Sequence, residues 1–255
     1  LNKFNTKEAE DMAEMFYGCN NLEELNLKAF DTKYVRDMSS MFSGCRKLKV
    51  LDLSSFNTPN LLSMKYLFID ARELTSIDMS NFDTSKVTNM DNAFYYCNNL
   101  KYLDLSKFNT KNVESMSSIF KGCFSLTSIK LSQNFDTSKV KSMDNMFQNC
   151  SSLESLGLTS FNTSNVQTMG GMFYNCSSLE SIDVSNFDTS KATTISNMFY
   201  SCKKLKEINL KNFDTKNFLY ISSLFYDCQS LISIDMSNFD FSEIIYLDKL
   251  FYGCS

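Results

Sequence analysis

Apolar positions recur along the whole chain with a fixed period. The tripeptide Phe-Asp/Asn-Thr starts at Phe4 and returns every 26 residues as far as Phe213, except for one step of 27 residues between Phe108 and Phe135. A tenth copy, Phe239-Asp240-Phe241, has Phe in place of Thr. Self-similarity at such a period is typical of solenoid proteins, in which each repeat is one structural unit. We therefore expect a single array of about ten repeats over residues 1–255.

The first part of each repeat has the spacing of a short buried strand. Leu100, Leu103 and Leu105 have the L-x-x-L-x-L pattern of a leucine-rich repeat, in which the last two leucines alternate inward. One repeat of 26 residues cannot bury its own apolar face, so neighbouring repeats must stack. The pattern predicts a ladder of parallel strands, one from each repeat.

The second part of each repeat has apolar residues at steps of three and four, which predicts a short helix with one buried face. In one repeat these residues are Val140, Met143, Met146, Phe147 and Cys150, and the preceding segment 136–138 offers side-chain oxygens to the first helical turn. Packed helices need roughly 8 to 10 Å, whereas strands lie about 4.8 Å apart. The expected fold is thus an α/β solenoid that curves or twists, with strands on the inner face and short helices on the other.

The composition excludes several classes of function. The chain has no His, so catalytic triads, His general bases and His-ligated metal sites are excluded. A net charge of -4 without a basic tract speaks against nucleic acid as a partner. No phosphate-binding glycine motif is present. We expect no enzymatic activity, no cofactor and no metal.

Membrane attachment is expected only through an anchor outside this chain. No apolar run approaches the length that spans a bilayer, and residues 1–4 lack both the charged start and the apolar stretch of a signal peptide. The array opens within a strand segment and ends at Ser255 without a polar capping repeat at either side. Solenoids normally need such caps, so we expect the chain to be a fragment of a longer protein.

Nine cysteines occupy one repeated position, and Ala71 stands in the slot where the tenth is missing. Their place at the end of an apolar run predicts a ladder of buried, reduced thiols, because free Cys behaves as a small apolar residue. The odd number also argues against a complete disulfide framework. Several tyrosines follow the second Phe of their repeats, and packing between repeats or a recognition stripe would both explain them: Tyr17, Tyr95, Tyr174, Tyr200, Tyr226 and Tyr252.

The repeat resembles that of a known family. The segments 74–97 (LTSIDMSNFDTSKVTNMDNAFYYC) and 179–202 (LESIDVSNFDTSKATTISNMFYSC) are similar to the BspA-like leucine-rich-repeat surface proteins, whose repeat also occurs in mycoplasma lipoproteins. The resemblance covers the whole chain and implies a place at the surface of a bacterium or parasitic protist, with an adhesive or host-binding role. The chain departs from the pattern at Ala71, near Gln133 and at Phe241, so local irregularities are expected there.

The strand face supplies the candidate ligand-binding residues. Asp52, Asp78 and Asp104 should stand in a row, where like charges repel unless hydrogen bonds or a cation offset them. These carboxylates would serve to bond Ser and Thr hydroxyls along the ladder, to bind a partner, or to hold Ca²⁺, although single carboxylates supply few of the oxygens that Ca²⁺ needs. Lys130 and Gly157 divide the row into two patches. The candidate residues are Asp52, Asp78, Tyr102, Asp104, Lys130, Asp183, Asn209 and Asp235.

Together these features favour a non-enzymatic module at the cell surface or outside the cell that binds a protein or glycan of a host or neighbouring cell. Contact would be multivalent across a rigid repeated surface. Two alternatives remain open. One is a structural spacer or coat, and the other is an intracellular interaction scaffold, which the unpaired cysteines favour.

Overall fold

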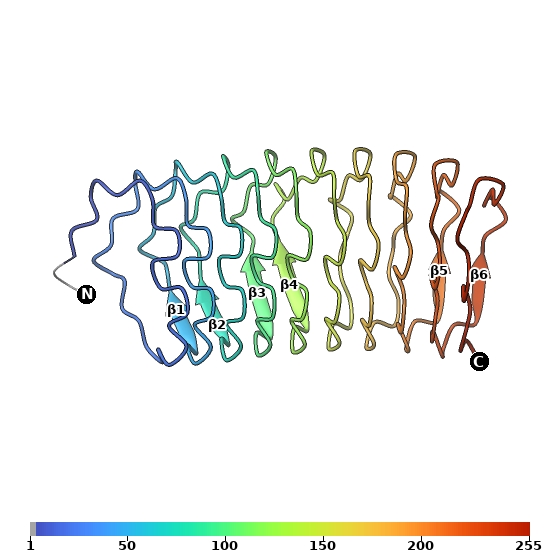
Figure 1. Ribbon diagram of the computed structural model, residues 1–255, viewed down its shortest axis with the longest axis horizontal. Coiled ribbons are helices and arrows are strands. Elements are labelled where there is room, and N and C mark those ends of the chain that lie inside the picture. Colours follow the sequence, from blue (N-terminus) through green and yellow to red (C-terminus); the bar gives the residue numbers. More distant parts are fainter. Residues whose placement is uncertain (1–3) are drawn as a thin grey trace.

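The computed structural model describes residues 4–255 and shows an elongated solenoid in which each repeat forms one coil (Figure 1). The coils lie side by side along the long axis, with the two termini at opposite ends. The strands in the described part are β1 (Val50–Asp52), β2 (Ser76–Asp78), β3 (Tyr102–Leu105), β4 (Ser128–Leu131), β5 (Glu207–Asn209) and β6 (Ser233–Asp235). A repeat solenoid with parallel strands is therefore confirmed.

The strands pair in the register expected from the repeat. Leu51 lies opposite Ile77 in β1 and β2, and β3–β4 and β5–β6 pair in the same parallel manner. Within residues 4–255, however, the strands form three separate two-stranded sheets, and 155–157 and 181–183 are not strands. The expectation of one continuous ladder is wrong. Strands of three or four residues hold few hydrogen bonds, so small shifts between coils separate them, and Gly157 weakens its segment further.

The predicted helices are wrong as well, because residues 4–255 contain no helix. The segment from the Phe-Asx-Thr motif to the cysteine, residues 135–150 in one coil, is here called the turn segment. Asn145 and Asn149 have left-handed φ values of 56° and 64°, and the matching positions of the other coils are also left-handed. A left-handed residue breaks an α-helix. Because such residues recur within each turn segment, the chain folds into successive tight turns instead.

Backbone hydrogen bonds of the turn segment alternate between two directions. The amides of Asn145 and Phe147 donate to the next coil, to Gly170 O and Met172 O at 2.9 and 2.8 Å. The amide of Met146, which lies between them, donates within its own coil to Met143 O at 3.2 Å. An α-helix would direct every amide along its own axis. The alternation instead joins each coil to the next.

A column of single parallel bridges runs through ten consecutive coils on the side of the turn segments. It consists of Asp11, Asp37, Ser63, Asn89, Ser115, Ser142, Thr168, Thr194, Tyr220 and Tyr246. Since the coils are joined by backbone bonds on this side too, both sides have the spacing of paired strands, about 4.8 Å. The reason to expect curvature is removed, and the row of coils is nearly straight in Figure 1.

The Phe-Asx-Thr motif joins neighbouring coils. The buried Thr137 hydroxyl donates to Asn162 O and accepts from Asn162 N, both at 2.8 Å. The Asp136 carboxylate accepts the Ser138 amide of its own coil at 2.8 Å. The helix-capping role expected for these residues is thus wrong. The threonine satisfies two backbone groups of the next coil, and the Asx side chain forms a local turn.

The expected irregularity near Gln133 is confirmed. Thr110 still donates to Asp136 O at 2.7 Å, as its equivalents do in other coils. The Asp136 amide, however, bonds Asn134 O at 2.9 Å in place of the threonine hydroxyl. The extra residue of this repeat therefore costs one of the two bonds that the motif makes elsewhere.

The core consists of columns of identical side chains. The Phe120 ring stacks on Phe94 and Phe147 at centroid distances of 5.7 and 5.3 Å, and this aromatic column continues from Phe16 to Phe251. The Cys150 thiol donates to Phe120 O of the preceding coil at 3.2 Å.

Burial of the cysteines is confirmed for seven positions, whereas Cys19 is exposed and Cys254 half-buried. The buried thiols are Cys45, Cys97, Cys123, Cys150, Cys176, Cys202 and Cys228. Burial raises the pKa of the Cys123 thiol to about 12, despite a hydrogen bond from the coil before it. A thiol with so high a pKa is held in its unreactive protonated form.

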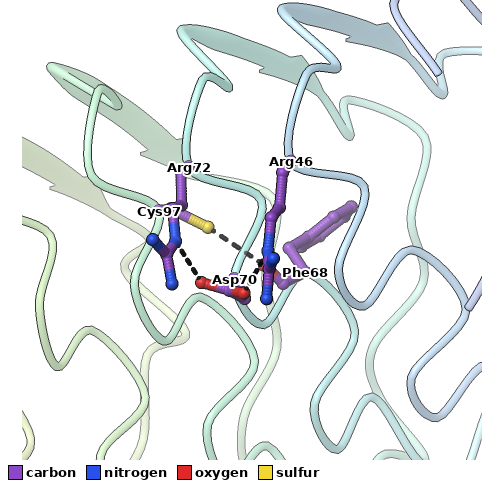
Figure 2. Close-up of polar contacts among 5 residues, drawn as sticks. All are labelled: Arg46, Phe68, Asp70, Arg72 and Cys97. Carbon is purple, nitrogen blue, oxygen red and sulfur yellow. Dashed lines mark hydrogen bonds and ion pairs between the residues drawn. The ribbon is translucent and has the colours of Figure 1, made fainter. Parts of the chain in front are cut away.

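The coil that lacks a cysteine carries a charged cluster on its surface (Figure 2). Cys97 donates its thiol hydrogen to Phe68 O at 3.3 Å, a bond that Ala71 is unable to make one coil earlier. Beside Ala71, the Asp70 carboxylate accepts from Arg46 Nε at 2.8 Å and Arg72 Nε at 2.5 Å. Partial burial raises the pKa of Asp70, but these hydrogen bonds outweigh it and hold the pKa below its ordinary value.

Candidate binding surface

The candidate aspartates lie at or near the ends of the strand-face segments, where they help to turn the chain. The side-chain oxygen of each accepts the amide two residues on, at 3.0 Å for Asp52, 2.9 Å for Asp78 and 2.8 Å for Asp104. Asp183, Asn209 and Asp235 make the same bond. These bonds lie within one coil. Asp52 Oδ1 also accepts the Ser54 hydroxyl at 2.6 Å, so the expected bonding to a serine hydroxyl is found at Asp52, within its own coil rather than with a neighbouring one. The second oxygen or the amide group of each side chain lies outside this bond, and the Oδ2 atoms of Asp52, Asp104 and Asp235 face lysines of neighbouring coils.

Lysines of neighbouring coils offset the repulsion between these carboxylates. Lys130 Nζ lies 3.3 Å from Asp104 Oδ2, and the pairs Lys28–Asp52 and Lys211–Asp235 are 4.0 and 3.6 Å apart. Hydrogen bonds from Ser106 first, and then Lys130, lower the pKa of Asp104 to about 2. Asp104 is therefore ionised at neutral pH, and the row and its lysines carry both signs of charge.

A shallow hollow brings four candidate residues together. Asp78, Tyr102, Asp104 and Lys130 line it, together with Ile77 of β2 and Met79, the residue after β2. Tyr102 is 49% exposed, and its hydroxyl donates to Asp104 Oδ2 at 3.4 Å. The hollow spans β2 and β3, which lie side by side but belong to separate sheets. It thus combines an aromatic ring, both charges and a break in strand pairing.

A second hollow lies beyond Gly157 and brings Asp183, Asn209 and Asp235 together. It spans residues 181–183, β5 and β6, with the isoleucines of these coils in its floor. A side chain added at Gly157 would meet open space. Asp52 lines neither hollow, although it lies opposite Asp78 in the β1–β2 pair, and it is paired with Lys28. The isoleucine floors were not expected, because the pattern places these residues inward, whereas Ile77 and Ile234 are only partly buried.

The tyrosines pack between coils rather than presenting their faces. Tyr174, Tyr200, Tyr226 and Tyr252 stack in sequence at 4.4, 4.4 and 4.8 Å, with nearly parallel rings. The prediction of packing between repeats is confirmed for these four, although the packing elements are turns. Tyr95 instead meets the edge of Tyr96 at 4.5 Å, and Tyr17 is 61% exposed.

Residues 4–255 hold no group of three or more His, Cys, Asp or Glu side chains arranged to bind a metal ion. The same part of the chain has no helix long and apolar enough to cross a membrane.

Solved structures similar to the chain include bacterial leucine-rich-repeat proteins. One from Bacteroides ovatus is 22% identical over 81% of this chain, with a TM-score of 0.36, and the chain spans 61% of that protein. One from Eubacterium ventriosum is 15% identical over 95% of this chain and 79% of its own, with a TM-score of 0.42. An internalin from Listeria monocytogenes is 18% identical over 78% of this chain and 76% of its own, with a TM-score of 0.32.

None of the curated proteins matches the chain. A family model described as "Mycoplasma protein of unknown function, DUF285" matches residues 1–101, 63–181 and 153–255, which together cover the whole sequence. These overlapping matches confirm the mycoplasma-type repeat that the motif indicates. The chain belongs to this DUF285 family.

Proposed function

We propose that the chain is a non-enzymatic binding module of a microbial cell-surface protein, and that its strand face binds a protein or glycan of a host or neighbouring cell. The observation that carries this proposal is the hollow at β2 and β3, where Tyr102 stands half-exposed beside Asp78, Asp104 and Lys130. Tyrosine is enriched at the centres of interfaces because it offers a large rigid contact area with a polar end. The charged groups around it form the polar rim of such a contact.

The break between β2 and β3 adds to the binding capacity of this hollow. A paired ladder satisfies the backbone groups of both strands, whereas strands of separate sheets leave edge groups for another partner. The isoleucines beneath the second hollow add apolar area, and the two hollows together offer two contacts to one large ligand. Membership of a mycoplasma family supports a place at the cell surface.

The proposal is tested with the purified chain on an array of extracellular matrix proteins and glycans. Reversing both charges in D78K/D104K should weaken binding to any positive spot about tenfold or more, because two repulsive contacts replace two favourable ones. The matched control E8K/E154K reverses two exposed acidic residues elsewhere and should leave binding unchanged. Equal affinity of D78K/D104K and the unmodified chain would overturn the strand face as the binding surface.

The location is tested separately by protease treatment of intact source cells, followed by mass spectrometry of the released peptides. Peptides from the region 74–97 should be released without those of a cytosolic control protein. Protection of the array until the cells are lysed would overturn the surface location and favour the intracellular scaffold.

A further inference from the structure

A second surface, away from the strand face, repeats every two coils rather than every coil. The motif Phe-Asp-Thr-Ser-Lys occurs at 82–86, 135–139 and 187–191. The coils just before these carry Phe-Asn-Thr-x-Asn instead, at 56–60, 108–112 and 161–165. One column of the solenoid therefore alternates between Asn and Lys over six consecutive coils.

The asparagines of this column hold the lysines in place. Each lysine Nζ donates to the Oδ1 atom of the asparagine one coil earlier, at 2.8 Å for Lys86, 2.8 Å for Lys139 and 2.5 Å for Lys191. The asparagines are fixed in turn, since Asn112 Nδ2 donates to Ser85 O at 2.7 Å, and Asn60 and Asn165 make equivalent bonds. Lys86, Lys139 and Lys191 are exposed and are here called the lysine row.

The charges of the lysine row remain available to a ligand. Lys141, the neighbouring lysine in this region, is paired with Glu114 at 2.8 Å. The lysine row makes hydrogen bonds to neutral amides, and no ion pair within 4 Å joins these three residues to another described side chain. The aspartates of the same coils turn their Oδ1 atoms to backbone amides, as Asp83 does with Ser85 N at 2.9 Å. Each ammonium group thus retains N–H donors for another partner.

Hollows form a furrow that contains Lys139 and Lys191, whereas Lys86 lies outside its lining. One is lined by Lys139, Lys191, Asn165, Gln167 and the Glu114–Lys141 pair. A second shares Gln167 and Lys191 and continues over later coils, and a third shares Glu114 and Lys141 and continues over earlier ones. The lining is dominated by amides, hydroxyls and charged groups, which suit the hydroxyl groups of a sugar better than apolar side chains.

The spacing of the row points to one class of ligand. Alternate coils lie about 9.6 Å apart, which is twice the strand spacing of about 4.8 Å. Each sugar in an extended polysaccharide spans nearly the distance between adjacent coils. An acidic group on every second sugar would therefore match the spacing of alternate coils, and so that of the lysine row. We propose that the lysine row and its furrow bind a linear acidic polysaccharide with one carboxylate in each disaccharide. A B-DNA duplex carries one phosphate per strand about every 3.4 Å along its axis and fits this spacing poorly.

The test uses hyaluronan oligosaccharides, which carry one uronic acid in each disaccharide, in titration calorimetry with the whole chain at low salt. K86Q/K139Q/K191Q should bind about tenfold more weakly, since three exposed ion contacts are lost. The control K47Q/K101Q/K204Q removes the same charge from exposed lysines elsewhere and should bind as the unmodified chain does. Dextran, an uncharged polysaccharide, should not bind.

The exchange N112K/K139N separates spacing from charge. It moves one lysine to the neighbouring coil without changing composition, and it should weaken binding nearly as much as loss of Lys139 alone. D78K/D104K should retain binding, because the furrow is independent of the strand face. No binding of hyaluronan, equal binding of the exchange variant, or tighter binding of single-stranded poly(dT) than of hyaluronan at equal ionic strength would each overturn the proposal.

Discussion

The strand face and the turn segments join neighbouring coils in different ways. On the strand face, short strands pair two by two, and the described residues form three separate sheets. Along the turn segments, single bridges connect ten consecutive coils, from Asp11 to Tyr246, and buried threonines bond the next coil at nearly every step. The turn segments therefore hold the stack together, while the interrupted strand face leaves hollows where a ligand fits.

This difference shows where an array of this kind tolerates sequence change. Most residues of the turn segment are buried, bonded to two coils, or left-handed, so their replacement affects more than one repeat. The exposed lysines of the lysine row are exceptions. A strand-face residue between the two inward positions is exposed and bonded mainly within its own turn. The strand face can thus vary with the ligand at little expense in stability, which is the usual relation between a scaffold and its binding surface.

The largest expected effect is that of T137V in the turn segment. Valine has the shape of threonine but leaves Asn162 N and O, both bonded to the Thr137 hydroxyl, without that partner. Two partly buried backbone groups without partners should lower the free energy of unfolding by about 3 kcal/mol. Urea denaturation measures the loss.

Two matched variants sharpen this result. T137S keeps the hydroxyl and should lose only about 1 kcal/mol for the missing methyl group. T127V, beside β4, removes one exposed bond to Lys101 O at 3.0 Å and should change stability by less than about 0.5 kcal/mol. Equal losses for T137V and T127V would contradict the greater contribution of the turn segment.

Glycine substitutions compare the two regions by backbone geometry. Gly122 in the turn segment has φ of 77°, and a Cβ there would lie 2.5 Å from the Tyr96 ring. G122A should lower the free energy of unfolding by about 2 kcal/mol through left-handed strain and this clash. G157A on the strand side meets open space and should be neutral or slightly stabilising.

Thermal unfolding measures both glycine variants under the same conditions. The double variant Y96A/G122A separates strain from clash, because removal of the ring relieves the clash alone. If G122A and G157A had equal melting temperatures, left-handed strain and the clash with Tyr96 would not lower stability at Gly122, and the prediction would be wrong.

The smallest expected effect is the change with pH in the contribution that Asp104, on the strand face, makes to the free energy of unfolding. The pKa of Asp104 in the folded chain is about 2, below its ordinary value of 3.8. Its contribution to stability is therefore complete above pH 3.8 and is lost as the pH falls through 2. Because the side chain is 44% exposed, the contribution should stay below about 1 kcal/mol.

Urea denaturation of the unmodified chain and D104N at several pH values measures this effect. The small difference in stability between the two should be constant from pH 7 to about pH 4 and disappear near pH 2. A difference that grows on acidification would contradict the lowered pKa.

The repeat length, the buried columns and the strand register followed from the sequence because they depend only on the period. The helix did not, since Val140, Met143 and Phe147 are buried equally well by a helix and by successive turns. The distinguishing signal was the residues between them. Asn145 and Asn149, and Gly44 and Gly122 in other coils, are types that tolerate left-handed backbone.

The exposure of individual side chains in the candidate site could be predicted from the sequence, but the hollow that they line could not. Alternation along the strand placed Tyr102 and Asp104 on the exposed side without any structure. The hollow beside them depends on a break between β2 and β3, which arises from small displacements that no single residue type encodes. The lysine row had a signal in the sequence, the two-repeat alternation, which a search for the single-repeat period does not find.

The unbroken bonding of the turn segments also determines how such a protein can change in length. Gain or loss of whole repeats by recombination between similar coding segments would alter its reach in steps of about 4.8 Å. Because both sides of each coil have the same spacing, the direction of the far end would hardly change. Gains of two repeats at a time would in addition preserve the alternation of Asn and Lys, whereas a single added repeat would place two like coils together.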